Sequence, residues 1–144
     1  MNEEQRRKVK AGWMARFSDF LPPKASESQL QAFEAEHGPL PKDVRWFLAE
    51  CGGGGLDPSI GGQSGIEALS RAHRKFKKEV AKGFWDLMRA TFMLGWDGAG
   101  NAFGLEIPSG RVVLQDHNFG GLHEIAPSLY DYFVDQIERP CSDD

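Results

Sequence analysis

The sequence predicts an α+β domain, in which an antiparallel meander of three or more strands is covered by helices on one face. Apolar residues recur every three or four positions through residues 3–82, which is the period of helices that bury one side. From residue 91 the period changes to two, as in strands whose side chains alternate between two faces. A last helical pattern follows at residues 128–137. Helices grouped before the strands, rather than alternating with them, favour an α+β fold over a parallel α/β fold.

Two helices are predicted in the first 38 residues. The first spans residues 3–20 and stops before Pro22, because proline lacks an amide hydrogen and restricts the residue before it. The second begins at Ser26, which forms a capping box with Gln29, and ends at Gly38. The predicted buried faces are Val9, Trp13, Phe17 and Leu21 in the first helix, and Leu30, Phe33 and His37 in the second.

Two more helices precede the strands. The third begins at Pro41, which suits a first helical turn, and ends in the glycines at 52–55. After a loop at 56–65, a fourth helix is predicted over residues 66–82, with a short helical turn at 84–88. The predicted buried stripes are Val44, Phe47, Leu48 and Cys51 in the third helix, and Ile66, Leu69, His73, Phe76 and Val80 in the fourth.

Three strands are predicted, at residues 91–96, 103–107 and 111–116. A Pro-Ser-Gly turn at 108–110 joins the last two, which favours an antiparallel pairing. Ser128, with Asp131 three residues later, caps the final helix, whose apolar side carries Leu129, Phe133 and Ile137.

At 144 residues the chain fits one domain. We assign residues 25–139 to that domain, 1–24 to an N-terminal helical extension and 140–144 to a polar tail. A charged N-terminal segment and the lack of any long apolar run argue against a signal peptide or a membrane span. Two cysteines, Cys51 on a helical stripe and Cys141 in the tail, argue against a disulfide framework, so we expect a cytoplasmic protein.

Charge is distributed unevenly. Residues 91–144 hold two Arg or Lys and nine Asp or Glu, a net charge of 2 − 9 = −7. Such a surface is poorly suited to nucleic acid and better suited to a basic protein partner. The exception is the segment 71–82, in which seven of twelve residues are Arg, Lys or His. A solvated helix face is the favoured interpretation of that segment, and a nucleic-acid contact is the alternative.

Glycine-rich and acidic motifs do not assemble into a recognisable catalytic or metal site. The glycines at 52–55 follow a predicted helix and lack the Lys-Ser/Thr pair of a phosphate loop. The segment 97–101 fails the oxygen spacing of a calcium loop, so a hairpin connection is favoured.

The remaining histidines and Cys51 also favour structural roles. Asp116, His117, His123 and Glu124 match no metal-ligand spacing, and an exposed loop explains them equally well. Cys51 has no accompanying His–Asn/Asp pattern, so we expect a buried thiol. We therefore expect no enzyme activity, cofactor or metal.

Four segments in order resemble the SUKH superfamily (Smi/Knr-type domains). They are residues 26–43, with a Gly-Pro-Leu-Pro connector; Phe47-Leu48 followed by glycines; the Gly-Trp-Asp-Gly-Ala-Gly-Asn segment at 95–101; and the strand ending in Asp116-His117 with the closing helix from Ile125. The resemblance covers residues 26–56 and 91–137. It implies a SUKH-like α+β fold and a binding module.

The resemblance implies that the chain is an immunity protein, because bacterial members neutralise a cognate toxin, often a nuclease. Fungal members are interaction hubs in cell-wall assembly, so a scaffolding or regulatory domain without a toxin is the alternative. The oligomeric state stays open. Because loops beside the predicted sheet carry them, the candidate partner-binding residues are Asp97, Asn101, Asp116, His117 and Glu124.

Overall fold

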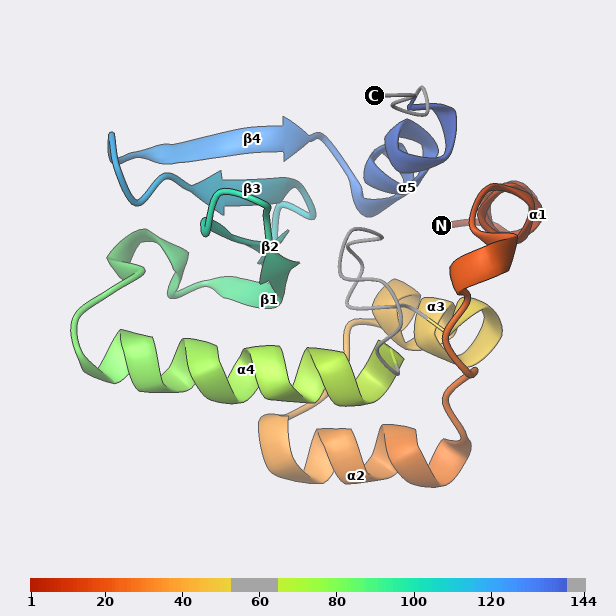
Figure 1. The fold of residues 1–144 in the computed structure, drawn as a ribbon, viewed down its shortest axis with the longest axis horizontal. Coiled ribbons are helices and arrows are strands. Elements are labelled where there is room, and N and C mark those ends of the chain that lie inside the picture. Colours follow the sequence, from red (N-terminus) through yellow and green to blue (C-terminus); the bar gives the residue numbers. More distant parts are fainter. Residues whose placement is uncertain (53–64, 140–144) are drawn as a thin grey trace.

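The computed structural model describes residues 1–52 and 65–139, and it is an α+β domain with five helices and a four-stranded sheet in these ranges (Figure 1). The predicted glycine terminator at 53–55, the loop at 56–64 and the tail at 140–144 lie outside the described residues. No helix in the described part of the chain is long and apolar enough to cross a membrane.

The predicted signals at the ends of α2 and α3 are present in the structure. Ser26 and Gln29 make both hydrogen bonds of the predicted capping box. Pro41 is the N-cap of the third helix, and Gly52 ends that helix in a left-handed conformation with a φ of 86°. The bounds are α1 Glu3–Arg16, α2 Glu27–His37, α3 Lys42–Cys51, α4 Gly65–Ala81 and α5 Leu129–Glu138, with short 3₁₀ helices η1 Ser18–Phe20 and η4 Asp86–Met88.

The sheet is a meander in which each strand pairs antiparallel with the next. Its strands are β1 Thr91–Trp96, β2 Ala102–Glu106, β3 Val112–Gln115 and β4 Leu122–Ala126. Neighbouring residues on one strand belong to different cores, since Phe103 packs into the main core and Ala102 into a smaller one. The smaller core is formed by Trp85, Met88 and Met93, with Ala102, so the segment before β1 covers part of the second face.

The main core joins all five helices to the sheet. Phe47 of α3 stacks on Phe133 of α5, with ring centroids 4.2 Å apart. Trp13 of α1 meets both rings edge-on, at 4.8 and 5.8 Å, and is 2% exposed. The first helix therefore packs on the rest of the domain and contributes to its core.

Two predictions about the helices need correction. The first helix ends at Arg16 instead of residue 20, and a separate 3₁₀ turn spans Ser18–Phe20. Pro22 restricts only Leu21, which is extended with a ψ of 121°, so the proline limits the 3₁₀ turn and not the α-helix. Val80, placed on a buried stripe by its spacing, is 38% exposed, because α4 extends past the core there.

One strand was missed. β4 falls in a segment interpreted as an exposed loop, and three of its five residues are exposed. A strand with so little burial has no alternating hydrophobic pattern, which is the signal on which strand prediction depends.

Candidate functional site

The loop between β1 and β2 is organised by Asp97. One of its carboxylate oxygens accepts hydrogen bonds from the backbone N–H groups of Ala99 and Asn101, at 2.9 and 2.8 Å. The other accepts from the Asn101 side-chain amide at 3.0 Å. Gly100, with a φ of 85°, supplies the backbone turn that this arrangement needs. The carboxylate of Asp97 therefore fixes the loop, as expected for a hairpin connection.

Asn101 links this loop to the end of β3. Its side-chain oxygen accepts the backbone N–H of His117 at 3.0 Å and also the Nδ1–H of the His117 ring. Because an amide oxygen only accepts, the His117 proton lies on Nδ1. Asn101 is buried and His117 is exposed, so this contact fixes the orientation of an imidazole ring that lies at the surface.

Asp116 shapes the turn that follows β3. Its carboxylate accepts the N–H groups of Asn118 and Phe119, both at 2.8 Å. These two bonds, the Phe119 bond foremost, lower the pKa of Asp116. The turn holds out Phe119, which is 93% exposed and is the most exposed of the large apolar side chains in the described ranges.

Glu124 lies apart from these four residues. It sits on β4 opposite Val113, and its carboxylate is 3.9 Å from Arg111. Arg111 is held more closely by Glu106, through bonds of 2.6 and 3.0 Å. The candidate residues thus divide into a connected group at one end of the sheet, Asp97, Asn101, Asp116 and His117, and Glu124 along the edge strand.

A groove of about 470 Å³ opens beside Asp97, between the sheet and α5. Its walls are largely apolar and include Phe103, Leu114 and Ile125 from the sheet and Tyr132 from α5. Charged side chains line it as well, namely Asp97, Asp135, Arg16 and Arg139. A groove lined by both aromatic or aliphatic and charged side chains is typical of a protein-binding surface.

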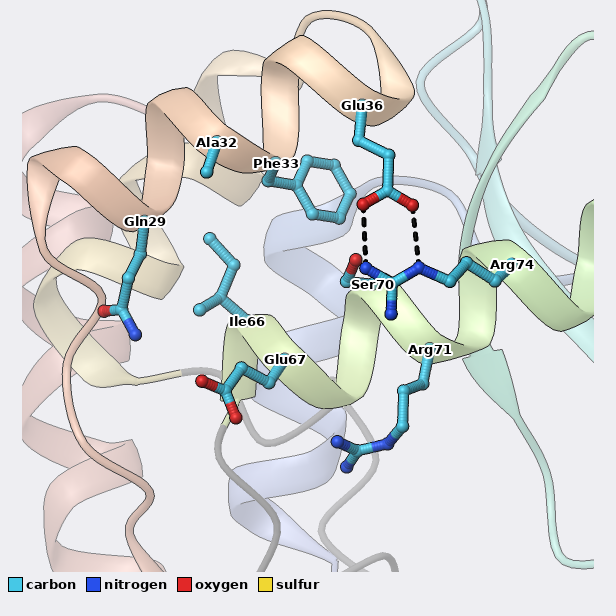
Figure 2. Close-up of a pocket in the computed structure, with 9 residues that line it drawn as sticks. All are labelled: Gln29, Ala32, Phe33, Glu36, Ile66, Glu67, Ser70, Arg71 and Arg74. Atoms are coloured by element: carbon cyan, nitrogen blue, oxygen red, sulfur yellow. Dashed lines mark hydrogen bonds and ion pairs between the residues drawn. The ribbon is translucent and has the colours of Figure 1, made fainter.

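A second groove, of about 420 Å³, separates α2 from α4 (Figure 2). Phe33 and Ile66 lie between the two helices, and a two-pronged ion pair between Glu36 and Arg74 spans them, with both N–O distances 2.7 Å. The Arg74 bond lowers the pKa of Glu36 to about 2.

Part of the basic segment 71–82 is engaged in such internal contacts. The ammonium group of Lys77 lies 3.0 Å from the His37 ring, and that of Lys75 lies 4.4 Å from the centre of the Trp96 ring. With Arg74 on Glu36, these contacts attach α4 to its neighbours, while Lys78 and Lys82 are exposed.

His73 and His123 are held by separate partners, and Cys51 is buried away from both. The His73 ring donates from Nε2 to the Met93 carbonyl at 2.7 Å, whereas His123 contacts the Gly120 carbonyl at 3.3 Å. Cys51 is buried, and burial raises the pKa of its thiol to about 12. Among the residues at 1–52 and 65–139, no three His, Cys, Asp or Glu side chains gather as a metal site would require.

Two features of this surface escaped sequence reasoning. The exposure of Phe119 follows from the turn that Asp116 stabilises, which the sequence analysis did not predict. An aromatic residue between Asp116 and Gly120-Gly121 was an available signal for an exposed turn. The edge strand β4 had no such signal, because most of it is exposed.

The family model described as SMI1 / KNR4 family (SUKH-1) matches residues 24–135, well over half of the chain. The matched range contains every helix and strand of the domain except α1, η1 and the end of α5. Neither a curated protein nor a solved structure gave a significant match.

Proposed function

We propose that this chain, which belongs to the SMI1 / KNR4 family (SUKH-1), is a non-catalytic protein-binding domain that acts as a cytoplasmic immunity protein against a cognate toxin. The family match supports a protein-binding domain of the immunity type. We further propose that the toxin is a nuclease, and the surface described above supports this choice of partner.

The observation that carries the proposal is the preorganised end of the sheet. Asp97, Asn101 and His117 join two loops through side-chain hydrogen bonds, and Asp116 fixes the turn that holds out Phe119. Exposed aromatic side chains on rigid supports are typical anchors of protein interfaces. Rigid loops also lose little conformational entropy on binding, which favours affinity.

Charge supports a basic partner. The carboxylates of Asp97, Asp116 and Glu124 are all partly or fully exposed. A toxin that binds nucleic acid carries a basic surface, so these groups would speed its association through long-range attraction. They would also oppose binding of nucleic acid to the same surface.

The test is co-expression of the full chain with a catalytically inactivated form of the toxin encoded by a neighbouring gene. We expect a stoichiometric complex and protection of cells against the active toxin. Phe119→Ser should weaken the complex at least about tenfold, as expected for loss of an aromatic anchor. The matched control is Ile107→Ser, because Ile107 is 50% exposed but lies after β2, at the other end of the sheet.

Two results would contradict parts of the proposal. Equal weakening by Ile107→Ser would show that Phe119 is not a specific anchor. Absence of both a complex and protection would reject that toxin as the partner and favour the alternative, a scaffolding or regulatory domain that binds another protein.

A further inference from the structure

The two edges of the sheet differ in how they are covered. α4 runs along β1, the first strand, as Figure 1 shows. The His73 side chain donates from Nε2 to the Met93 carbonyl, a backbone group that points away from β2. This contact supplies a partner for an edge-strand carbonyl and closes that edge to another strand.

β4, the strand at the other edge, pairs with β3 alone among the described strands. The pairing pattern shows which of its backbone groups point outward. Asp116 donates its N–H to Gly121, so in the alternating antiparallel ladder His123 bonds to Leu114 across the strands. The N–H and C=O groups of Leu122 and Glu124 therefore point away from the sheet.

We propose that an extended segment of the partner protein docks on the outer edge of β4 and adds a fifth strand to the sheet. The backbone groups of Leu122 and Glu124 would supply the hydrogen bonds, as in other complexes formed by strand addition. β4 has no proline or lysine, two residues that commonly protect edge strands.

Side chains on the two faces of β4 define the chemistry of that segment. On one face Ile125 is 43% exposed and forms part of the groove with Leu114 and Tyr132, so an aliphatic side chain on the added strand would extend this apolar surface. On the other face Glu124 is exposed, and Arg111 beside it is already bound closely by Glu106. A lysine or arginine on the segment would complement Glu124.

The docked segment is short. A register shift interrupts the β3–β4 pairing between Val112 and Val113, and Pro127 follows the end of β4. Gly120 and Gly121, both with positive φ, bound the other end. Pairing is thus confined to the stretch around Leu122–Glu124, and the partner supplies alternating aliphatic and basic residues there.

Amide-resolved hydrogen exchange on the full chain tests this directly. The probe is a capped synthetic peptide of alternating valine and lysine, and the control is the same peptide with every second amide N-methylated. We expect the first peptide to slow exchange at Leu122 and Glu124 at least about tenfold, with His123 protected from the start. The methylated peptide should have no effect.

Charge reversal gives a second readout. Glu124→Lys should weaken binding of the valine–lysine peptide and strengthen binding of a valine–glutamate peptide, because it reverses the charge that faces the added strand. Glu124 is available for this contact, since it is exposed and its only ion pair among the described residues is the 3.9 Å one to Arg111. A lack of binding at millimolar peptide, or binding that leaves the Leu122 and Glu124 amides fast, would overturn the proposal. So would protection that arises only from dimers of the chain itself.

The partner's identity rests on the proposed function, but the two can fail separately. If the inactivated toxin binds while the Leu122 and Glu124 amides still exchange freely, the immunity function stands and strand addition is wrong. If the peptide protects these amides but no toxin is captured or neutralised, strand addition stands and the toxin assignment is wrong.

Discussion

The side-chain oxygen of Asn101 accepts two hydrogen bonds from His117, one from its backbone N–H and one from its ring. The same side chain donates to Asp97 at 3.0 Å. One buried amide therefore holds together the β1–β2 loop and the end of β3, and the geometry of the proposed binding surface depends on it.

Replacing Asn101 by alanine should destabilise the fold and weaken partner binding together. The change removes the acceptor of the His117 N–H and the donor to the Asp97 carboxylate, both in part-buried hydrogen bonds, and the loss of the two together costs about 1–3 kcal/mol. Chemical denaturation measures the free energy of unfolding. Asn118→Ala is the control, because Asn118 is exposed and its hydrogen bond to Asp116 comes from its backbone N–H, which alanine keeps. Equal stability of the two variants would contradict this role for Asn101.

Replacing Trp13 by alanine should lower the free energy of unfolding by about 3–5 kcal/mol, the usual range for a buried aromatic side chain. The reason is its edge contacts with Phe47 and Phe133, which tie α1 to α3 and α5. Phe84→Ala, at a side chain that is 57% exposed, should change stability little. A small effect of Trp13→Ala would instead show that α1 is a detachable extension.

Local signals predicted the helices well because each has a physical cause within a few residues. The capping box at Ser26 and the stripe Val44, Phe47, Leu48 and Cys51 are both confirmed. The packing of Trp13 against Phe133 was not predictable, because it joins residues 120 positions apart in the chain, and spacing carries no information about such contacts.

The candidate site was predictable in residue type but not in arrangement. The sequence placed Asp97 and Asn101 in the connection between two strands and Asp116 at the end of a third, and Asp116 lies directly after β3. The carboxylates of Asp97 and Asp116, however, accept hydrogen bonds from their own loops, so they shape the surface as well as contribute negative charge to it. Whether they contact a partner stays a prediction.

Stability should fall as pH decreases from 6.5 towards 4, because of His73. Burial lowers its pKa from the ordinary 6.5 to about 4 in the folded state. Between these pH values the unfolded chain binds more protons at this position than the folded chain does. The free energy of unfolding is therefore highest above pH 6.5 and decreases as the pH falls towards 4. The difference corresponds to on the order of 3 kcal/mol. Urea unfolding at several pH values from 7.5 to about 4.5 measures it, a range that ends near the ordinary pKa of the carboxylates.

The control variant for this effect is His73→Gln, whose amide can still donate to the Met93 carbonyl but does not titrate. It should flatten the pH dependence. His37, 5.2 Å from His73 between ring centres, also has a pKa lowered by burial and contributes with the same sign, so His37→Gln should flatten it further. A pH dependence that is unchanged in His73→Gln would contradict the assignment.

The basic segment of α4 should not make this chain a nucleic-acid binder. Arg74 is bound by Glu36, Lys77 contacts His37 and Lys75 covers the Trp96 ring, so several of its cations already have protein partners. We expect labelled single-stranded RNA and duplex DNA to show no binding by fluorescence anisotropy at low salt. We also expect the double variant Lys78→Gln and Lys82→Gln, at two exposed positions, to leave toxin binding unchanged. A nucleic-acid affinity that falls steeply with salt and is lost in this double variant would instead establish a phosphate-contacting surface on this segment.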